Sequence, residues 1–267
     1  MSDTPAVADD LALLKEAARE AGRIAMRFFR KDAQVWWKEG NSPVSEADLA
    51  VDGFLRETLL HARPDYGWLS EETAPLDSAA SREGRFFVVD PIDGTRAFLR
   101  GDDDWCVSLA VVSGGRPVAG VIDAPSREEV YLATAESEAS LNGETIRVAE
   151  PGRDDRLRLA MPDPMRRRLE GAPAGRGVEA QRNVPSLAYR LALVASGRID
   201  ATLIRPRACD WDIAAGDLIL ERAGGHLTAH GGGAPVYEIA GRRHGLLMAG
   251  PPWARGRLDE LGAYLAD

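Results

Sequence analysis

The chain has 267 residues, of which 45% are apolar and 28% are charged, with 27 Gly, two Cys and a formal net charge of −9. This composition is typical of a globular protein that buries a large core, so neither a disulfide nor a structural metal is needed to hold the fold. Two cysteines outside any CxxC pair exclude a disulfide framework and a zinc ribbon, and the negative charge argues against a nucleic acid polymer as partner.

No segment of the chain is typical of a membrane span or a secretory signal. The apolar runs are shorter than the roughly 18 residues that a span needs, and the opening MSDTPAVADD lacks a basic region followed by an apolar one. We therefore expect a cytoplasmic protein without a membrane partner and with reduced thiols.

The first half predicts two helices followed by a sheet. Apolar residues at helical spacing predict an amphipathic helix over 11–30, and a second helix should begin after Ser45, which forms a capping pattern with Asp48, and end at Pro64. Turn residues then separate β-rich runs at 85–90, 106–112, 117–122 and 129–133 and near Ile146. We expect a mostly antiparallel sheet packed against both helices.

A Pro-Gly segment at 150–155 marks an expected boundary between domains 1–150 and 151–267. The second domain alternates strands and helices, as an α/β layer does. Strands are predicted at 157–161, 199–204, 226–228 and 246–248, helices at 186–195, 211–222 and 254–265, and loops at 166–168 and 171–177.

The strongest chemical signal is Asp90-Pro91-Ile92-Asp93-Gly94-Thr95, which directly follows an apolar strand. Two carboxylates three residues apart, with a proline between them, can hold hard cations from a preorganised turn. Gly94 permits close backbone approach, so its N–H and that of Thr95 could bind a phosphate oxygen. The same motif also occurs in ordinary turns.

Four further acids have both a chemical and an ordinary interpretation. Adjacent glutamates such as Glu71 and Glu72 are usually surface charge, Asp212 at the start of a helix can complement the helix dipole, and Asp48 can serve only as a cap.

Four segments together resemble the inositol monophosphatase superfamily, in the order and with the spacing of that family. They are Asn41-Ser42-Pro43-Val44-Ser45-Glu46-Ala47-Asp48, Leu69-Ser70-Glu71-Glu72, the Asp90–Thr95 motif and Trp211-Asp212-Ile213-Ala214-Ala215-Gly216. The resemblance implies an α/β fold, an αβαβα sandwich of the inositol monophosphatase/fructose-1,6-bisphosphatase type. It also implies a Mg²⁺-dependent phosphomonoester hydrolase, often lithium-sensitive and commonly a homodimer.

The resemblance also assigns site residues. One Mg²⁺ would be held by Glu71, Asp90 and the Ile92 carbonyl, and a second by Asp90, Asp93 and Asp212, with Glu72 beside them or on a third ion. Asp48 and Thr95 would orient and deprotonate the attacking water. Six of the acids would then belong to one site, which leaves a charge of −3 on the other residues. Two or three Mg²⁺ ions would make that site attractive to a phosphate dianion.

The choice of phosphorylated metabolite depends on a few side chains. Arg205 occupies the place where inositol monophosphatases usually carry a glutamate, and a guanidinium suits a second anionic group. This feature favours the 3′(2′),5′-bisphosphate nucleotidase branch, with Gly94, Thr95, Ser186 and Arg205 as substrate contacts. Only Arg190 could replace the Lys that this branch tends to show after Ser186. Inositol or sugar monophosphates, then histidinol phosphate, are the alternatives, and a non-catalytic binding protein is a further one.

The remaining distinctive residues have ordinary interpretations. Trp36-Trp37 is predicted to be a packing or interface feature, and Cys209 a buried apolar group. His226 is expected to be an ordinary strand residue, because Mg²⁺ prefers oxygen ligands, and Asp102-Asp103-Asp104 a solvated turn.

Overall fold

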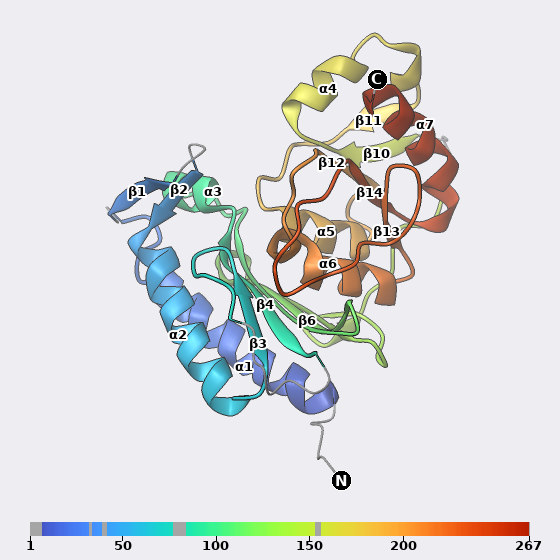
Figure 1. Cartoon of the computed structure of the whole chain (residues 1–267). Coiled ribbons are helices and arrows are strands. Elements are labelled where there is room, and N and C mark those ends of the chain that lie inside the picture. The colour runs from blue at the N-terminus through green and yellow to red at the C-terminus, as the bar shows by residue number, and fades with distance from the viewer. Residues whose placement is uncertain (1–6, 32–33, 39–41, 77–83, 153–155, 267) are drawn as a thin grey trace.

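The structure is a computed structural model that describes residues 7–31, 34–38, 42–76, 84–152 and 156–266 (Figure 1). Asn41 and residues 153–155 of the expected boundary lie outside the described residues. Among the described helices, each one is too short or too polar to cross a bilayer.

Two helices, α1 (Val7–Met26) and α2 (Glu46–Ala62), cover one face of the first sheet. The predicted start of α2 is confirmed: Ser45 caps it, and the Ser45 N–H donates to Asp48 Oδ2 at 2.8 Å in a capping box. The first helix was predicted over 11–30 but begins and ends four residues earlier. It ends at Met26 because the residues after it form tighter turns, in which the Phe28 N–H donates to Ala25 O. A hairpin of β1 (Val35–Lys38) and β2 (Ser42–Ser45), which was not predicted, precedes α2.

The first sheet has seven strands in the order β3-β4-β5-β6-β7-β8-β9. Their bounds are β3 Gly67–Ser70, β4 Phe86–Asp93, β5 Cys106–Ser113, β6 Arg116–Ala124, β7 Glu129–Thr134, β8 Ser140–Leu141 and β9 Glu144–Thr145. Only the β3–β4 pair is parallel, so the predicted, mostly antiparallel sheet is confirmed. The predicted strand near Ile146 is confirmed as the short β9, which ends at Thr145, and the Ile146 N–H donates to Ala139 O at 3.0 Å.

The second sheet has five strands in the order β11-β10-β12-β14-β13. Its strands are β10 Leu157–Ala160, β11 Val178–Ala180, β12 Ala201–Ile204, β13 His226–Ala229 and β14 Leu247–Gly250. The remaining helices are α3 Thr95–Arg100, α4 Asp163–Leu169, α5 Leu187–Ala195, α6 Asp210–Arg222 and α7 Arg255–Ala266, with short 3₁₀ turns at Pro125–Arg127, Pro173–Gly175 and Pro252–Ala254. The predicted loop at 166–168 is wrong, because these arginines lie in α4 and Arg168 donates to the Leu265 carbonyl at 2.8 Å.

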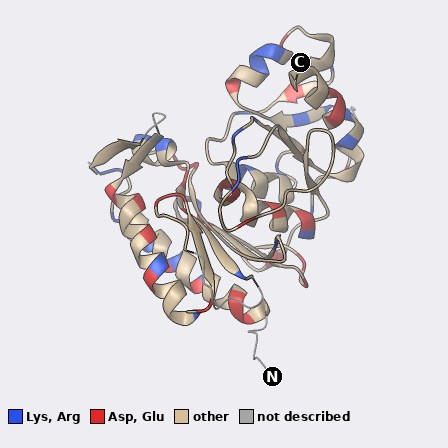
Figure 2. Cartoon of the chain, viewed as in Figure 1, with Lys and Arg blue, Asp and Glu red and all other residues tan. Residues whose placement is uncertain are grey.

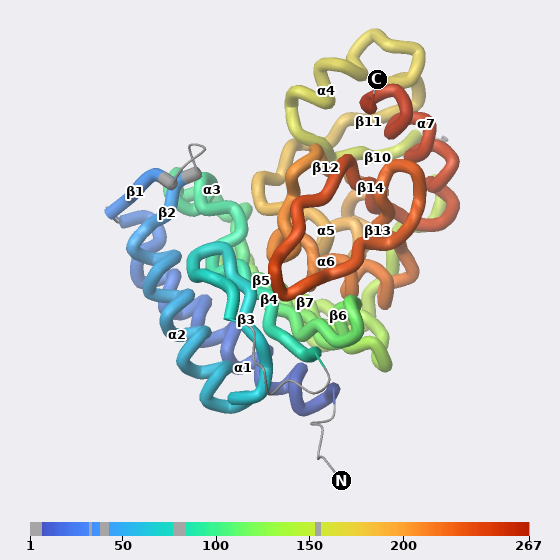
Figure 3. The backbone as a smooth tube through the Cα atoms, viewed as in Figure 1, coloured from blue at the N-terminus to red at the C-terminus, as the bar shows by residue number. Residues whose placement is uncertain are grey.

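The elements stack as five layers, which confirms the αβαβα sandwich (Figures 1 and 3). In order, the layers are α1 with α2, the seven-stranded sheet, α5 with α6, the five-stranded sheet, and α4 with α7. Both acidic and basic residues lie along α1 and α2, which form an outer layer (Figure 2).

Strand β4 is buried along its whole length because helices cover both faces of its sheet. Phe87 and Val89 pack toward α1 and α2, whereas Phe86 and Val88 pack toward α5 and α6. Each such side chain stabilises the fold by about 1.5–3 kcal/mol through burial. Strand β4 is thus a rigid base for the acidic turn at its carboxyl end.

Candidate active site

Three aspartates from distant parts of the chain meet at the end of β4. One carboxylate oxygen from each of Asp90, Asp93 and Asp212 lies within 4.8 Å of the others. Asp90 and Asp93 come from β4, and Asp212 lies in the first turn of α6. Opposite ligands of an octahedral Mg²⁺ are about 4.2 Å apart, so these oxygens could share one ion after only a small movement.

The surroundings of Asp90 fit a cation. Asp90 is buried, and its Oδ1 has no hydrogen-bond partner among the described residues. Burial raises the pKa of Asp90 well above its usual range, and the charges of Glu71, Asp93, Asp212 and Asp48 raise it further. A buried oxygen without a donor among several carboxylates is the arrangement that a hard cation completes.

The other two aspartates show the same deficit of positive charge. Burial raises the pKa of Asp93, although hydrogen bonds from Ser186 and Ala188 oppose the shift. Burial, followed by the charge of Asp93, raises the pKa of Asp212 to about 7. Protons or metal ions must therefore balance this cluster near neutral pH.

The two glutamates follow β3, the parallel neighbour of β4. Both side chains are half-buried. The Glu71 N–H donates to Val89 O at 3.3 Å, which keeps this residue beside the end of β4, and its charge acts on Asp90. Glu71 therefore lies beside the acidic cluster, and the metal-binding roles of both glutamates remain predictions.

Asp48 links the cap of α2 to the turn after β4. Its Oδ2 accepts hydrogen bonds from the backbone N–H and the hydroxyl of Ser45, while the Thr95 hydroxyl lies 3.3 Å from its Oδ1. Thr95 Oγ1 also lies 3.2 Å from the Ile92 carbonyl, which the resemblance assigns to a metal. The structure thus brings Asp48, Thr95 and Ile92 together.

Asp93 is held from the other side by α5. Its Oδ2 accepts hydrogen bonds from the Ser186 hydroxyl and the Ala188 N–H, both at 2.6 Å. Ser186 is fully buried and also caps α5 by accepting from the Tyr189 N–H at 3.1 Å. In this structure Ser186 orients a predicted metal ligand, and its predicted contact with substrate remains a prediction.

Gly94 ends the acidic turn with φ +95°, in the left-handed region that favours glycine. A Cβ at this position would lie 2.8 Å from Asp104 O and 3.1 Å from Ser186 Cβ. Gly94 precedes α3, so the N–H groups of the first turn lie next to Asp93. Only glycine fits here without moving the backbone on either side.

Arg205 lies close to the acidic cluster, as the sequence predicts. It is exposed after β12, and its charge lowers the pKa of Asp212. The same charge acts on Arg190, which is buried and donates to Asn183 Oδ1 and Val184 O, each at 3.2 Å. Arg205 is therefore free to meet a solvent-side ligand, whereas Arg190 is engaged inside the protein.

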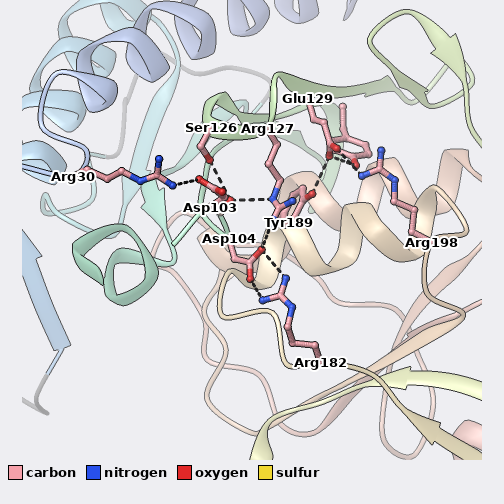
Figure 4. A network of polar contacts seen from close by, with 10 residues as sticks. Arg30, Asp103, Asp104, Ser126, Arg127, Glu129, Arg182, Tyr189 and Arg198 are labelled. Carbon is pink, nitrogen blue, oxygen red and sulfur yellow. Dashed lines mark hydrogen bonds and ion pairs between the residues drawn. The ribbon is translucent and has the colours of Figure 1, made fainter. Parts of the chain in front are cut away.

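The prediction of a solvated turn at Asp102–Asp104 is wrong for Asp104, which is buried (Figure 4). Asp104 Oδ1 accepts from Arg127 at 2.7 Å and from Arg182 at 3.0 Å. Burial raises the pKa of Asp104, but the hydrogen bonds and charges of both arginines outweigh it, so the pKa is lowered. Both partners are distant in sequence, so no local pattern could have indicated this network.

The structure also shows the exposure of the two tryptophans, Cys209 and His226, for which the sequence predicts ordinary roles. Trp36 and Trp37 are 45% and 62% exposed, so they do not pack in the core, and a role at an interface remains a prediction. Cys209 is half-buried rather than buried. His226 lies in β13 with an exposed side chain, as expected for an ordinary strand residue.

Comparison with known proteins gives a consistent family. A family model described as "Inositol monophosphatase family" matches residues 7–261. The chain is 30% identical to a histidinol-phosphatase of Chlorobaculum parvum, covering 95% of this chain and 96% of that protein, and 34% identical to an inositol-1-monophosphatase of Mesorhizobium japonicum, covering 85% and 88%. It is 31% identical to a 3′(2′),5′-bisphosphate nucleotidase CysQ of Aggregatibacter actinomycetemcomitans, covering 79% and 80%. The crystal structure of the extragenic suppressor protein suhB of Bartonella henselae aligns with a TM-score of 0.82 at 30% identity, covering 95% and 98%.

Proposed function

Since this chain belongs to the inositol monophosphatase family and is a phosphomonoester hydrolase, we propose that it is a 3′(2′),5′-bisphosphate nucleotidase that uses Mg²⁺. Its substrate would be adenosine 3′,5′-bisphosphate, and its products AMP and phosphate. The observation that carries this proposal is an exposed guanidinium, Arg205, whose charge acts on Asp212 of the acidic cluster. A substrate with a second phosphate would meet this charge once its first phosphate lies on the metal site.

The residues around the acidic turn would handle the attacking water. Asp48 is held through its Oδ2 by Ser45, so its Oδ1 is fixed toward the Thr95 hydroxyl. A water that donates its proton to Thr95 Oγ1 would allow the Thr95 proton to move to Asp48 Oδ1. The pair would therefore orient the water and remove its proton.

Asp90, Asp93, Asp212 and Glu71 would hold the metal ions, with the Ile92 carbonyl, and Glu72 would lie beside them. When bound, Mg²⁺ supplies charge that neutralises the phosphate and lowers the pKa of a bound water. The N–H groups of Gly94 and Thr95, at the start of α3, would donate to a phosphate oxygen.

An inositol or sugar monophosphatase is the second candidate. The 34% identity to an inositol-1-monophosphatase exceeds the 31% identity to the nucleotidase, so overall similarity does not favour the nucleotidase. A neutral polyol, however, offers no anion to Arg205. The substrates of these two candidates differ in this charge, which makes Arg205 the residue to test.

The test compares kcat/KM for adenosine 3′,5′-bisphosphate with that for inositol 1-phosphate, in the wild type and in Arg205→Ala. We expect the wild type to prefer the nucleotide, and the substitution to reduce that preference about 10- to 100-fold, since hydrogen bonds to charged groups contribute roughly 1.5–3 kcal/mol. Any effect through Asp212 acts on both substrates and cancels in the ratio. Equal losses, or a wild-type preference for inositol phosphate, would exclude the nucleotidase.

Three further properties remain predictions. They are a homodimeric state, inhibition by lithium and a cytoplasmic location. The number of bound metal ions, two or three, is also a prediction.

A further inference from the structure

Two segments outside the acidic cluster pair with each other directly before α6. We call residues 207–210 and 242–244 the arginine clasp, because Arg207, Arg242 and Arg243 lie in it. Its backbone hydrogen bonds run from the Arg207 N–H to His244 O at 2.7 Å, from the His244 N–H to Ala208 O at 2.8 Å and from the Asp210 N–H to Arg242 O at 3.2 Å. A β-bridge also joins Cys209 to Arg243.

The clasp is held from inside by the buried side chain of Asp210, which contacts both His244 and Arg242. Asp210 is fully buried, its Oδ1 lies 2.7 Å from His244 Nε2, and its Oδ2 accepts from the Arg242 N–H at 3.0 Å. These contacts fix the backbone that carries the arginines, so their side chains start from a defined position.

The connection from β13 to β14 carries one side of the clasp across both halves of the molecule (Figure 3). The Tyr237 N–H donates to Gly115 O at 3.0 Å in the β5–β6 turn. A Cβ at Gly241 would lie 3.2 Å from Leu69, which precedes Glu71 by two residues, and 3.7 Å from Trp211, which precedes Asp212. Gly241, which directly precedes one side of the clasp, therefore lies against the residues next to two predicted metal ligands.

Within the clasp, the three arginines are not equivalent. Arg242 pairs with Glu238 at 3.2 Å, whereas Arg207 and Arg243 are exposed and have no carboxylate partner within the described part of the chain. Arg243 contacts the Cys209 thiol and lowers its pKa, whereas the nearby charges of Asp212 and Glu71 raise it. The Arg243 guanidinium thus lies beside a thiol that is itself close to Asp212 and Glu71, in a protein with a net charge of −9.

The backbone at Arg207 supports a functional interpretation. Its φ is +85°, an uncommon value for a residue with a side chain. Such a conformation persists only where the surrounding structure imposes it, and here the hydrogen bond to His244 does so. Arg207 thus has an exposed side chain at a position where glycine would be less strained.

We propose that Arg243, together with Arg207, forms a subsite for the second anionic group of the substrate, such as the 5′-phosphate of a nucleoside 3′,5′-bisphosphate. The inference rests on the proposed nucleotidase function and extends it from Arg205 to two arginines of the clasp. The scissile phosphate would lie on the acidic cluster and the second phosphate on the guanidinium groups of Arg243 and Arg207. Arginine suits this task because its planar fork donates two parallel hydrogen bonds to phosphate oxygens.

The experiment uses 3′-AMP, which lacks the second phosphate, as the reference substrate in saturating Mg²⁺. The measured quantity is the ratio of kcat/KM for adenosine 3′,5′-bisphosphate to that for 3′-AMP. We expect Arg243→Gln to lower this ratio about 10- to 100-fold, mainly through a higher KM for the bisphosphate, and Arg207→Gln to lower it less. Arg243→Lys should restore part of the ratio because it keeps the charge without the fork.

Arg242→Gln is the matched control, since it makes the same charge change one residue away. Neighbouring side chains in a bridged segment point in opposite directions, and Arg242 is already paired with Glu238, so its ratio should equal that of the wild type. Thermal unfolding checks that each variant is folded.

The outcomes separate the two proposals. A wild type without a preference for the bisphosphate overturns the nucleotidase proposal, and the subsite with it. A wild-type preference that Arg243→Gln retains, or that Arg242→Gln loses equally, overturns the subsite alone.

Discussion

Asp90 and Asp104 are both buried aspartates, yet their surroundings are opposite in charge. Asp104 is 2% exposed and receives hydrogen bonds from Arg127 and Arg182, whereas Asp90 is 1% exposed and faces other carboxylates. Burial alone raises the pKa of both, but arginine partners reverse the shift for Asp104 and like charges enlarge it for Asp90. Burial thus favours the neutral form of both carboxyl groups, and the charge of the neighbouring side chains decides whether the final pKa lies above or below its usual value.

This difference separates a structural role from a functional one. The Asp104 network is neutralised by residues of the chain itself and joins the segment after α3 to the segments that carry Arg127 and Arg182 (Figure 4). Among the described residues, Asp90 Oδ1 has no hydrogen-bond partner, and the charges of Arg205 and Arg190 do not cancel the raised pKa values of Asp212 and Asp93, so the cluster stays available to ions from solvent. Substitutions of Asp90, Ser186 and Asp104 test this distinction between the metal-binding cluster and the structural network.

The largest expected effect is that of Asp90→Asn. Loss of the central carboxylate should reduce Mg²⁺-dependent phosphate release about a thousandfold or more. It should also stabilise the metal-free protein by about 1 kcal/mol or more, because it removes one of several facing charges. Thermal unfolding with and without Mg²⁺ measures this second effect, and a variant that retains the Mg²⁺-induced stabilisation of the wild type would contradict the metal assignment.

An intermediate effect is expected for Ser186→Ala. The substitution removes a hydroxyl donor to Asp93, and loss of a group that orients a metal ligand typically weakens metal binding 10- to 100-fold. The Mg²⁺ concentration for half-maximal activity should rise by about that factor. Ser196→Ala, at the other end of α5, is the control, because its hydroxyl donates to carbonyls of its own helix, Ala192 O and Leu193 O. A change in substrate KM at saturating Mg²⁺, without a change in Mg²⁺ requirement, would instead favour direct contact with substrate.

The smallest effect concerns stability. Asp104→Asn should lower the free energy of unfolding by about 2 kcal/mol, because it weakens two ion pairs at a buried carboxylate while one arginine partner stays mostly exposed. Asp103→Asn should cost less than about 1 kcal/mol, since its pair with Arg30 is 3.0 Å long and exposed to solvent. Urea unfolding of both variants measures the difference, and equal losses would contradict the distinction between these neighbours.

Much of the fold could be predicted because its signals are local. The Ser45–Asp48 cap, the apolar run before Asp90 and the glycine turns between strands act over a few residues, and the structure confirms them. The antiparallel pair of β1 and β2 was missed because these four-residue strands show little alternation. Strands β8 and β9 have only two residues each, too few to show alternation, so a single strand near Ile146 was predicted where the structure has two.

The acidic site could be predicted because its motifs are short and chemically specific. The partners of these motifs could not. Ser186 reaches Asp93 across 93 positions of sequence, and Arg182 reaches Asp104 across 78. The arginines of the clasp are likewise brought together only by the crossing of the β13–β14 connection. Contacts of this kind depend on how the layers stack, which no single segment encodes.

Gly94 has a consequence for how this protein can vary. Every replacement adds a Cβ that meets the Asp104 carbonyl and the Ser186 side chain, and so pushes on both clusters at once. Selection at position 94 therefore acts against any side chain, because even a Cβ atom does not fit there. A lineage that keeps catalysis would hold Gly94 as strictly as any aspartate of the site, although it contributes no side chain to the chemistry.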